Sequence, residues 1–535
     1  MFVLALIGGG LVGDRVLALT DDARDTLRTY TDLVTVAHDR YGAEVSYKDL
    51  VYASIQGMLR RLDPHTSFLP PKAYTGMRER QQSSFYGLGI LVGVRNGQLT
   101  VISPIEGTPA SRLGMRAGDI ISTIEGESTE SMTLDEAVDR LKGPKDTQVN
   151  ITIARRGLAE PLQLAVTRAE IPQTTVRLAY MLDEETAYVQ ISDFGRGTGR
   201  EVKEALDTLR TAGMKRLLVD LRNNGGGLLD QAIEVADQFL GDGSKIVETR
   251  GRTRDSFQSY RASDKYDELE VPVIMLVNRG TASAAEILSG AVQDHDIGLV
   301  VGTPTWGKGL VQTVYSLSYG AGLALTTAKY YTPSGRLIQR DYTSFFDYYN
   351  YDPTAEDPRQ AVGEGDPAEI FRTDLGREVY GGGGITPDVE IEPTDFTPFQ
   401  QYLFARSTFF AFAVDYASRQ QVSDDTWQPP EDLADAFEQW LIDEEFATRE
   451  QLDEEMDDVG RELSVRQIHA EIMNSAFGQE ARHRVLARGD VQVQRALELF
   501  GEAGELLARR QQLDEAERQQ ARNTLAPTTS NADGS

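Results

Sequence analysis

The chain has 535 residues, of which 40% are hydrophobic, enough for three or four compact units and too many for a disordered polypeptide. Its 83 acidic and 54 basic residues give a formal charge of −29, which repels phosphate backbones, so we expect no nucleic-acid partner. The sequence has no cysteine and its five histidines lack metal-ligand spacing, which excludes disulfides and thiolate sites and leaves no metal site to expect.

The chain starts with a short apolar run, Phe2 to Val12. This run is short for a membrane span. A secretory signal would also have a positive residue before its apolar run, and none precedes this one. We interpret residues 1–20 as the remnant of a signal or anchor segment. A loosely packed, disordered N-terminus is the alternative.

Residues 21–82 are predicted to form a helical arm. Apolar residues follow a helical pattern from Asp21 to Arg61 with a break at Gly42, and a turn-rich segment ends at Pro70 and Pro71. His65 lies in that turn, where nothing near it in sequence offers a chemical partner. We therefore expect a structural role for His65.

Residues 83–168 combine short strands, short helices and a glycine loop, Tyr86-Gly-Leu-Gly-Ile-Leu-Val92. With Ala117-Gly-Asp-Ile-Ile121 and a helix over Thr133–Leu141, this order resembles a PDZ domain. In that family a peptide adds to the sheet as a strand while loop N–H groups bind its terminal carboxylate. The resemblance implies peptide contacts at Gly87, Leu88, Gly89 and Ile90. The alternative is a small sheet domain that only packs.

Residues 169–395 alternate strands and helices, a pattern typical of an α/β domain. Within it, Tyr342 to Glu369 is predicted to be a polar excursion. Residues 396–523 carry helical patterns without strand signals, and the polar tail 524–535 is predicted to be disordered. The expected C-terminal helices cover 399–419, 433–444, 449–458, 465–487 and 491–522.

Ser283 stands where the apolar run Val271–Val277 and a small-residue turn meet the next helical pattern. A serine needs a base and an oxyanion-binding donor pair to act as a nucleophile. The local pattern Ser283-Ala-Ala-Glu286 also matches a helix capping box, in which serine only binds backbone N–H groups. The small neighbours of Ser283 and the N–H groups of a helix start favour the nucleophile.

The base is expected to be a lysine. His295 follows Ser283 by twelve residues, or about 18 Å along a continuous helix, too far to reach it. Lys308 lies between two glycines in an apolar stretch, and burial lowers the pKa of a lysine toward neutrality. Gln312 would share the face of Lys308 if this stretch is helical. The alternatives are a surface lysine and an exposed amide.

Three segments carry a second resemblance: 280–287 (GTASAAEI), 302–312 (GTPTWGKGLVQ) and 326–336 (TTAKYYTPSGR). Together they resemble the C-terminal processing peptidases, or tail-specific proteases, the PDZ-containing members of peptidase family S41. The resemblance covers residues 22–392. It implies a ClpP/crotonase-like α/β protease core with an inserted PDZ domain, a helical N-terminal arm and an all-α C-terminal extension.

The same resemblance implies a Ser283–Lys308 dyad supported by Gln312. It also implies an oxyanion hole made by the N–H of Ala284 and by one N–H of the glycine turn, for which we choose Gly226. The family usually has Pro or Ser where this chain has Gly225. The donor within residues 225–227 therefore stays open.

The sequence thus predicts a serine endopeptidase that cleaves proteins whose exposed C-terminal tails its PDZ domain captures, with no cofactor. A catalytically silent PDZ scaffold is the alternative, although the dyad residues and Gln312 are all present. We expect a homo-oligomer, a dimer or higher, formed through the arm or the C-terminal helices, and a regulatory protein partner is open. The expected location is the bacterial cell envelope, in the periplasm or anchored to the inner membrane.

Overall fold

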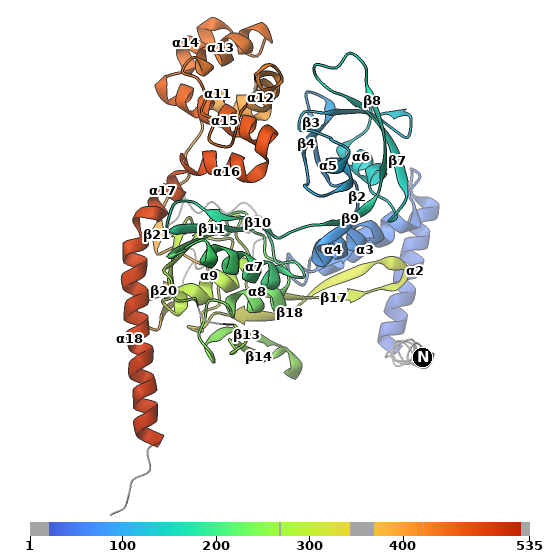
Figure 1. Cartoon of the computed structure of the whole chain (residues 1–535). Helices are drawn as coiled ribbons and strands as arrows, with labels where there is room; N and C mark the ends of the chain where they lie inside the picture. Colours follow the sequence, from blue (N-terminus) through green and yellow to red (C-terminus); the bar gives the residue numbers. More distant parts are fainter. Residues whose placement is uncertain (1–20, 267–268, 343–368, 421, 526–535) are drawn as a thin grey trace, which may run out of the picture. The chain divides into compact units, whose positions relative to one another are not determined.

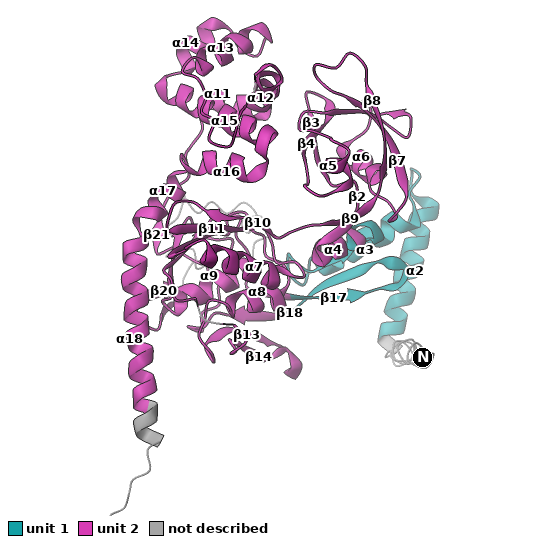
Figure 2. Ribbon diagram, viewed as in Figure 1, with its two compact units in different colours: residues 1–74, 312–327 teal, residues 75–311, 328–535 magenta. Residues whose placement is uncertain are grey.

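The computed structural model describes residues 21–266, 269–342, 369–420 and 422–525. The chain forms two compact units (Figure 2): residues 1–74 with 312–327, and residues 75–311 with 328–535. The predicted signal or anchor segment, most of the polar excursion after Tyr342 and the last ten residues of the predicted disordered tail lie outside the described residues.

The smaller unit contains the predicted helical arm. Helix α2 spans Asp21–Arg40 and helix α3 spans Tyr47–Leu59, which confirms both helices and the break between them. Ser46 caps α3 by accepting a hydrogen bond from the N–H of Asp49 at 3.0 Å. Strand β1 (Ser67–Leu69) pairs antiparallel with residues 322–324 of strand β18 (Gly322–Tyr331).

Helix α4 (Pro71–Gln82) leads into the domain predicted to be PDZ-like, which belongs to the larger unit (Figure 1). Its sheet has the order β3-β4-β5-β7-β8, with β3 at an edge, and β6 pairs with β5. Helix α6 begins with a complete capping box at Thr133 and buries Ala137 and Leu141 in the domain core. The elements are β2 (Ser84–Gly87), β3 (Ile90–Arg95), β4 (Gln98–Pro104), α5 (Pro109–Arg112), β5 (Ile120–Ile124), β6 (Glu127–Ser128), α6 (Leu134–Leu141), β7 (Gln148–Ala154), β8 (Leu162–Thr167) and β9 (Ala169–Pro172).

A six-stranded sheet forms the centre of the larger unit, in the order β10-β11-β12-β15-β16-β21. All neighbours are parallel except β10 and β11, as expected when helices connect successive strands. The strands are β10 (Val176–Met181), β11 (Thr186–Ile191), β12 (Arg216–Asp220), β15 (Val273–Val277), β16 (Gly298–Gly302) and β21 (Val389–Glu390).

Helices cover both faces of this sheet because alternate residues of each strand point to opposite sides. Leu217 and Val219 pack with α7 (Thr198–Thr211), α8 (Leu229–Ala236) and α9 (Ala284–Asp294). Leu218 between them packs on the opposite face, with residues of the C-terminal helices. The predicted α/β alternation is confirmed.

Other strands pair outside the six-stranded sheet. Strand β13 (Lys245–Gly251) pairs antiparallel with β14 (Gln258–Arg261) and with residues 328–331 of β18. Strand β17 (Leu310–Ser316) pairs with β18, and β19 (Ile370–Arg372) pairs with β20 (Glu378–Tyr380).

The C-terminal region is helical as predicted, but three expected helices are each divided. The breaks fall at Ser407 and Gly478, which have positive φ angles of 54° and 88°, and at Leu499. The helices are α11 (Pro398–Ala405), α12 (Thr408–Arg419), α13 (Leu433–Asp443), α14 (Arg449–Glu455), α15 (Asp458–Phe477), α16 (Gln479–Ala487), α17 (Val491–Glu498) and α18 (Phe500–Leu525). None of the helices in the described part of the chain has the length and apolar content that a membrane span requires.

Candidate active site

Ser283 occupies a strained turn between strand β15 and helix α9, as the sequence predicts. Its backbone has φ 57° and ψ −114°, a conformation that costs a residue with a side chain about 1–3 kcal/mol. Two bonds hold the loop before it: the N–H of Ala282 donates to the carbonyl of Asn224 at 2.8 Å, and the hydroxyl of Thr281 donates to Leu221 O at 2.8 Å. Such a turn projects a side chain at the start of a helix, which suits a nucleophile.

Glu286 connects the serine to the lysine segment. Its side chain is fully buried, and Oε2 accepts the backbone N–H of Ser283 at 2.7 Å and that of Lys308 at 2.9 Å. Oε1 accepts the hydroxyl of Thr305 at 2.5 Å and the N–H of Gly307 at 2.7 Å. Burial raises the pKa of Glu286, while these four donors act in the opposite direction. One carboxylate therefore binds the backbones of both predicted catalytic residues.

Tyr330, on strand β18, binds the same two residues through their carbonyl groups. Its hydroxyl donates to Ser283 O at 2.9 Å and to Lys308 O at 2.7 Å, so one proton is shared between them. The ring is almost completely buried. Glu286 and Tyr330 together thus hold the N–H and the C=O of both residues, which fixes the serine turn against the lysine segment.

The sequence indicated these two positions only in part. We interpreted Glu286 as one half of a capping box, and its carboxylate does accept the N–H of Ser283. The three other donors come from residues 305–308, which no local pattern relates to Glu286. Tyr330 lies in a family motif without a role inferred for it.

The lysine segment is not helical. Lys308 is half-buried and precedes strand β17, so the helical spacing that would place Gln312 on its face does not apply. Gln312 lies in the smaller unit, where its amide Nε2 donates to the carbonyl of His65 at 2.8 Å. Asp63 orders the same turn by accepting the N–H groups of His65 and Thr66. These bonds fix the backbone of the turn, and the structural role expected for the His65 side chain stays a prediction.

The glycine turn after strand β12 packs directly on the serine. A methyl group added at the Cα of Gly226 would lie 2.7 Å from the Cβ of Ser283 and 2.9 Å from the N atom of Ala284. Ala284 is the first residue of helix α9, whose leading N–H groups have no partner within the helix. The N–H of Gly226 itself donates to Asn224 Oδ1 at 2.9 Å. In this structure the N–H we chose as oxyanion donor is therefore already bound.

His295 cannot act on Ser283. It follows the last residue of α9, a helix that is continuous from Ala284 to Asp294. Its Nδ1 lies 2.8 Å from Asp374 Oδ2 and its Nε2 lies 2.7 Å from Lys245 O. Burial favours the neutral ring, but Asp374 outweighs it and raises the pKa of His295. Both nitrogens are engaged at the end of the helix opposite Ser283.

The predicted peptide loop lies ahead of edge strand β3. The carbonyl of Gly89 accepts the N–H of Ile105 at 2.9 Å and the hydroxyl of Thr108 at 3.0 Å, while Leu88 O accepts the N–H of Ala110. Gly89 has φ +80°, and any Cβ there would clash with Thr108. The loop is thus fixed beside an unpaired strand edge, which can accept another strand.

Across residues 21–266, 269–342, 369–420 and 422–525, no group of three or more His, Asp or Glu side chains is arranged to hold a metal ion.

Sequence comparison relates two parts of the chain to known families. The sequence profile of Peptidase family S41 matches residues 185–344, and that of a PDZ domain matches residues 100–155. The chain is 40% identical over 318 residues to a carboxy-terminal-processing protease of Bartonella bacilliformis, covering 58% of this chain and 70% of that protein.

Two further proteins are similar over a comparable length. The carboxy-terminal processing protease CtpA of Bacillus subtilis is 33% identical over 292 residues, covering 54% of this chain and 62% of that protein. A solved photosystem II D1 C-terminal processing protease is 28% identical, with 66% of this chain and 85% of that chain covered and a TM-score of 0.35.

Proposed function

The chain belongs to peptidase family S41 and is a serine peptidase, and we propose that Ser283 is its nucleophile and Lys308 its general base. The observation that supports this most directly is the pair of buried groups that join the two residues. Glu286 accepts both backbone N–H groups and Tyr330 donates to both carbonyls. Residues 25 positions apart in the sequence are thereby held together at a helix start, where N–H groups favour a developing negative charge.

In the proposed acylation step, Lys308 acts as a neutral amine. The hydroxyl proton of Ser283 moves to Lys308 Nζ as Oγ attacks the scissile carbonyl carbon. The resulting ammonium then protonates the leaving amine nitrogen, the C–N bond breaks and an ester to Ser283 remains. Water attacks this ester in the second half of the reaction, with Lys308 again accepting a proton and returning it to Oγ.

The oxyanion of each tetrahedral intermediate would be bound by the N–H of Ala284 and by one N–H of the glycine turn. Gly226 is close enough to the serine, but its N–H must exchange its bond to Asn224 Oδ1 before it can donate to a substrate. Otherwise Gly225 or Gly227 supplies the second donor. Gln312 is proposed to support the lysine, with its Nε2 oriented by the carbonyl of His65.

The PDZ domain is proposed to capture the C-terminal tail of a substrate protein, because the bacterial relatives are named for carboxy-terminal processing. The loop Gly87, Leu88, Gly89 and Ile90 would bind the terminal carboxylate, and the tail would pair with edge strand β3. Cleavage of one peptide with a free or an amidated C-terminus tests this. Equal rates for both would contradict tail capture.

The dyad is tested by cleavage of casein, a disordered protein, with Ser283→Ala and Lys308→Ala. We expect each variant to lose about 10³-fold or more in rate, while residual catalysis survives from binding and the oxyanion donors. His295→Ala serves as the matched control and should remain active. If both dyad variants cleave at the native rate, the chain is a scaffold in this reaction or uses another nucleophile.

Two further expectations remain proposals. A homo-oligomer formed through the arm is supported by helix α2, which exposes more than half of the side chains of Leu27, Leu33 and Val36. Light scattering of Leu33→Glu should then report a smaller particle than the native chain. A location in the cell envelope rests on the apolar run Phe2–Val12 and is tested by cell fractionation.

A further inference from the structure

The glycine turn beside Ser283 starts from a buried ion pair. Asp220, the last residue of strand β12, is only 1% exposed, and its carboxylate accepts the side chain and the backbone N–H of Arg222. Burial alone would raise the pKa of Asp220, but Arg222 outweighs it and lowers that pKa. This pair therefore sets the backbone direction at which the chain leaves the strand and enters the turn.

The glycine turn then binds the loop before Ser283 directly through hydrogen bonds. Asn223 N donates to Asn278 Oδ1 at 2.8 Å, and Asn224 O accepts the N–H of Ala282 at 2.8 Å. Asn224 is two residues after Arg222 and binds Ala282, the residue before Ser283. A displacement of Arg222 would thus be passed to the serine loop. Misplacing a reacting group by about 1 Å costs on the order of 10²-fold in rate.

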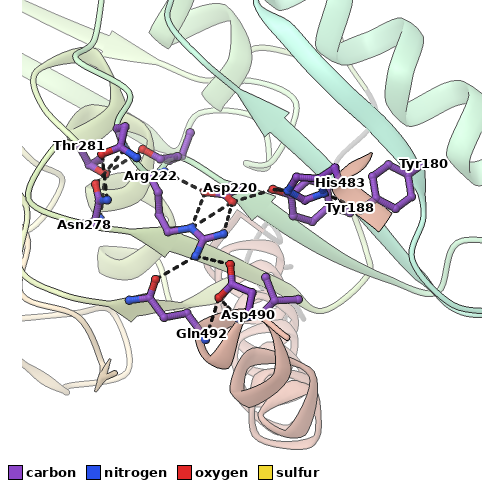
Figure 3. A network of polar contacts seen from close by, with 12 residues as sticks. Tyr180, Tyr188, Asp220, Arg222, Asn278, Thr281, His483, Asp490 and Gln492 are labelled. Carbon is purple, nitrogen blue, oxygen red and sulfur yellow. Dashed lines mark hydrogen bonds and ion pairs between the residues drawn. The ribbon is translucent and has the colours of Figure 1, made fainter. Parts of the chain in front are cut away.

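Arg222 has a second set of partners in the C-terminal helical region (Figure 3). Its Nη1 donates to Asp490 Oδ2 at 2.8 Å and to Gln492 Oε1 at 2.9 Å. Asp490 is the N-cap of helix α17, where its other oxygen accepts the N–H groups of Gln492 and Val493. Gln492 is held in turn by donating Nε2 to Ile391 O at 2.7 Å. The start of α17 therefore supplies the hydrogen-bond acceptors for Nη1 of the Arg222 guanidinium.

A second chain of hydrogen bonds reaches Asp220 from helix α16. Tyr188 donates its hydroxyl proton to Asp220 Oδ2 at 2.6 Å, so its oxygen must accept from His483 Nε2 at 3.1 Å. The remaining nitrogen, Nδ1, then accepts from the hydroxyl of Tyr180 at 2.8 Å. Burial lowers the pKa of His483, which agrees with this neutral tautomer. Both carboxylate oxygens of Asp220 thus accept hydrogen bonds, and Asp220 and Arg222 each have partners in the C-terminal helices.

The C-terminal helices that carry these residues are anchored on the sheet. Helices α17 and α18 cover the face of the six-stranded sheet opposite α9, where strand and helix residues form one buried cluster. Its helix members are Ala487, Val493, Ala496, Leu499, Phe500, Ala503 and Leu506. All of them lie beyond residues 185–344, the part of the chain that matches the peptidase family.

We propose that Asp490, Gln492 and His483 are positioning residues for the reaction, which act through Arg222 and Asp220 on the glycine turn that supplies an oxyanion donor. The C-terminal helical region is then a part of the active-site framework. This inference rests on the proposed function, because it needs the glycine turn to bind the oxyanion.

The test uses Asp490→Asn in the full-length chain. Asparagine caps a helix as well as aspartate does, so the start of α17 is retained while the charge facing Arg222 is lost. Asp457→Asn is the matched control, because Asp457 caps helix α15 by accepting the N–H of Gly460. His483→Phe is a second variant, which keeps an aromatic ring beside Tyr180 and Tyr188 but removes both hydrogen bonds.

Four quantities separate positioning from folding. They are kcat and KM for a fluorogenic peptide, the affinity for a peptide boronic acid of the same sequence, and Tm. The boronate forms a tetrahedral adduct with a catalytic serine and places an oxygen where the oxyanion binds. We expect about a tenfold fall in kcat for Asp490→Asn, less than the roughly 10²–10³-fold cost of a lost oxyanion donor. KM should stay within twofold, and boronate affinity should fall in parallel with kcat.

Each outcome decides the proposal. It is overturned if Asp490→Asn and His483→Phe both keep native kcat and boronate affinity. It is also overturned if their kcat and boronate affinity fall no further than those of Asp457→Asn at equal Tm. Ser283→Ala and Lys308→Ala distinguish the two levels of inference. If they abolish cleavage while the Asp490 variant is native, only the positioning role fails; if they cleave normally, the proposed dyad itself fails.

Discussion

Tyr330→Phe is the sharpest test of how the dyad is held. The substitution removes one oxygen and keeps the buried ring, so the surrounding core is unchanged in volume apart from that atom. The hydroxyl donates to Ser283 O and to Lys308 O. Its loss therefore acts on the contact between the two catalytic segments.

The magnitude follows from what remains bound. The carbonyl of Ser283 still accepts the N–H of Glu286 at 2.9 Å and that of Ile287 at 3.0 Å, so the serine turn keeps its helix bonds. The carbonyl of Lys308 loses a 2.7 Å bond, although Glu286 still holds its N–H. We expect a stability loss of about 0.5–1.5 kcal/mol, the net value of one hydrogen bond. We expect kcat to fall about tenfold, because the lysine is displaced by only part of an ångström.

The assay measures kcat and KM with a fluorogenic peptide, together with the free energy of unfolding in urea. Tyr260→Phe is the matched control, since Tyr260 lies on strand β14 of the same sheet and its hydroxyl binds Gln258. A native kcat for Tyr330→Phe with the expected loss of stability would refute the reasoning. The bond would then stabilise the fold without positioning Lys308.

Four other substitutions test the site. Glu286→Gln should lower kcat by about tenfold to 10²-fold, since an amide turns N–H groups toward buried donors. Burial raises the pKa of Glu286 in the folded state. Stability should therefore fall as pH rises from the unfolded-state pKa through the folded-state pKa, and this pH dependence should be absent from urea unfolding of the variant. Gly226→Ala should abolish cleavage, because the added methyl would meet Ser283, whereas Gly225→Ala has open space and should stay near native in a rate assay. His295→Ala should lower the free energy of unfolding in urea by about 2 kcal/mol, because the variant loses two buried hydrogen bonds, while kcat should stay nearly unchanged.

Local features of the active site were predictable from the sequence. An apolar run, small residues and a helical pattern place Ser283 at a strand-to-helix junction, where β15 ends and α9 begins. The fixed rise of a helix excludes His295 as the base, whatever the rest of the fold. Where local conformation was misjudged, at Gln312, the stretch forms a strand because it pairs with β18.

The contacts that assemble the site depend on tertiary structure. Glu286 accepts donors from residues 305, 307 and 308, which follow a strand of the central sheet, and Tyr330 comes from a different sheet. Arg222 and Asp490 are 268 residues apart in sequence. A pattern of apolar and small residues fixes which segments become helix or strand, because that choice depends on neighbours within a few positions. It does not fix which buried donor meets which buried acceptor, since those pairs form only when the sheet and both of its helical layers are packed together.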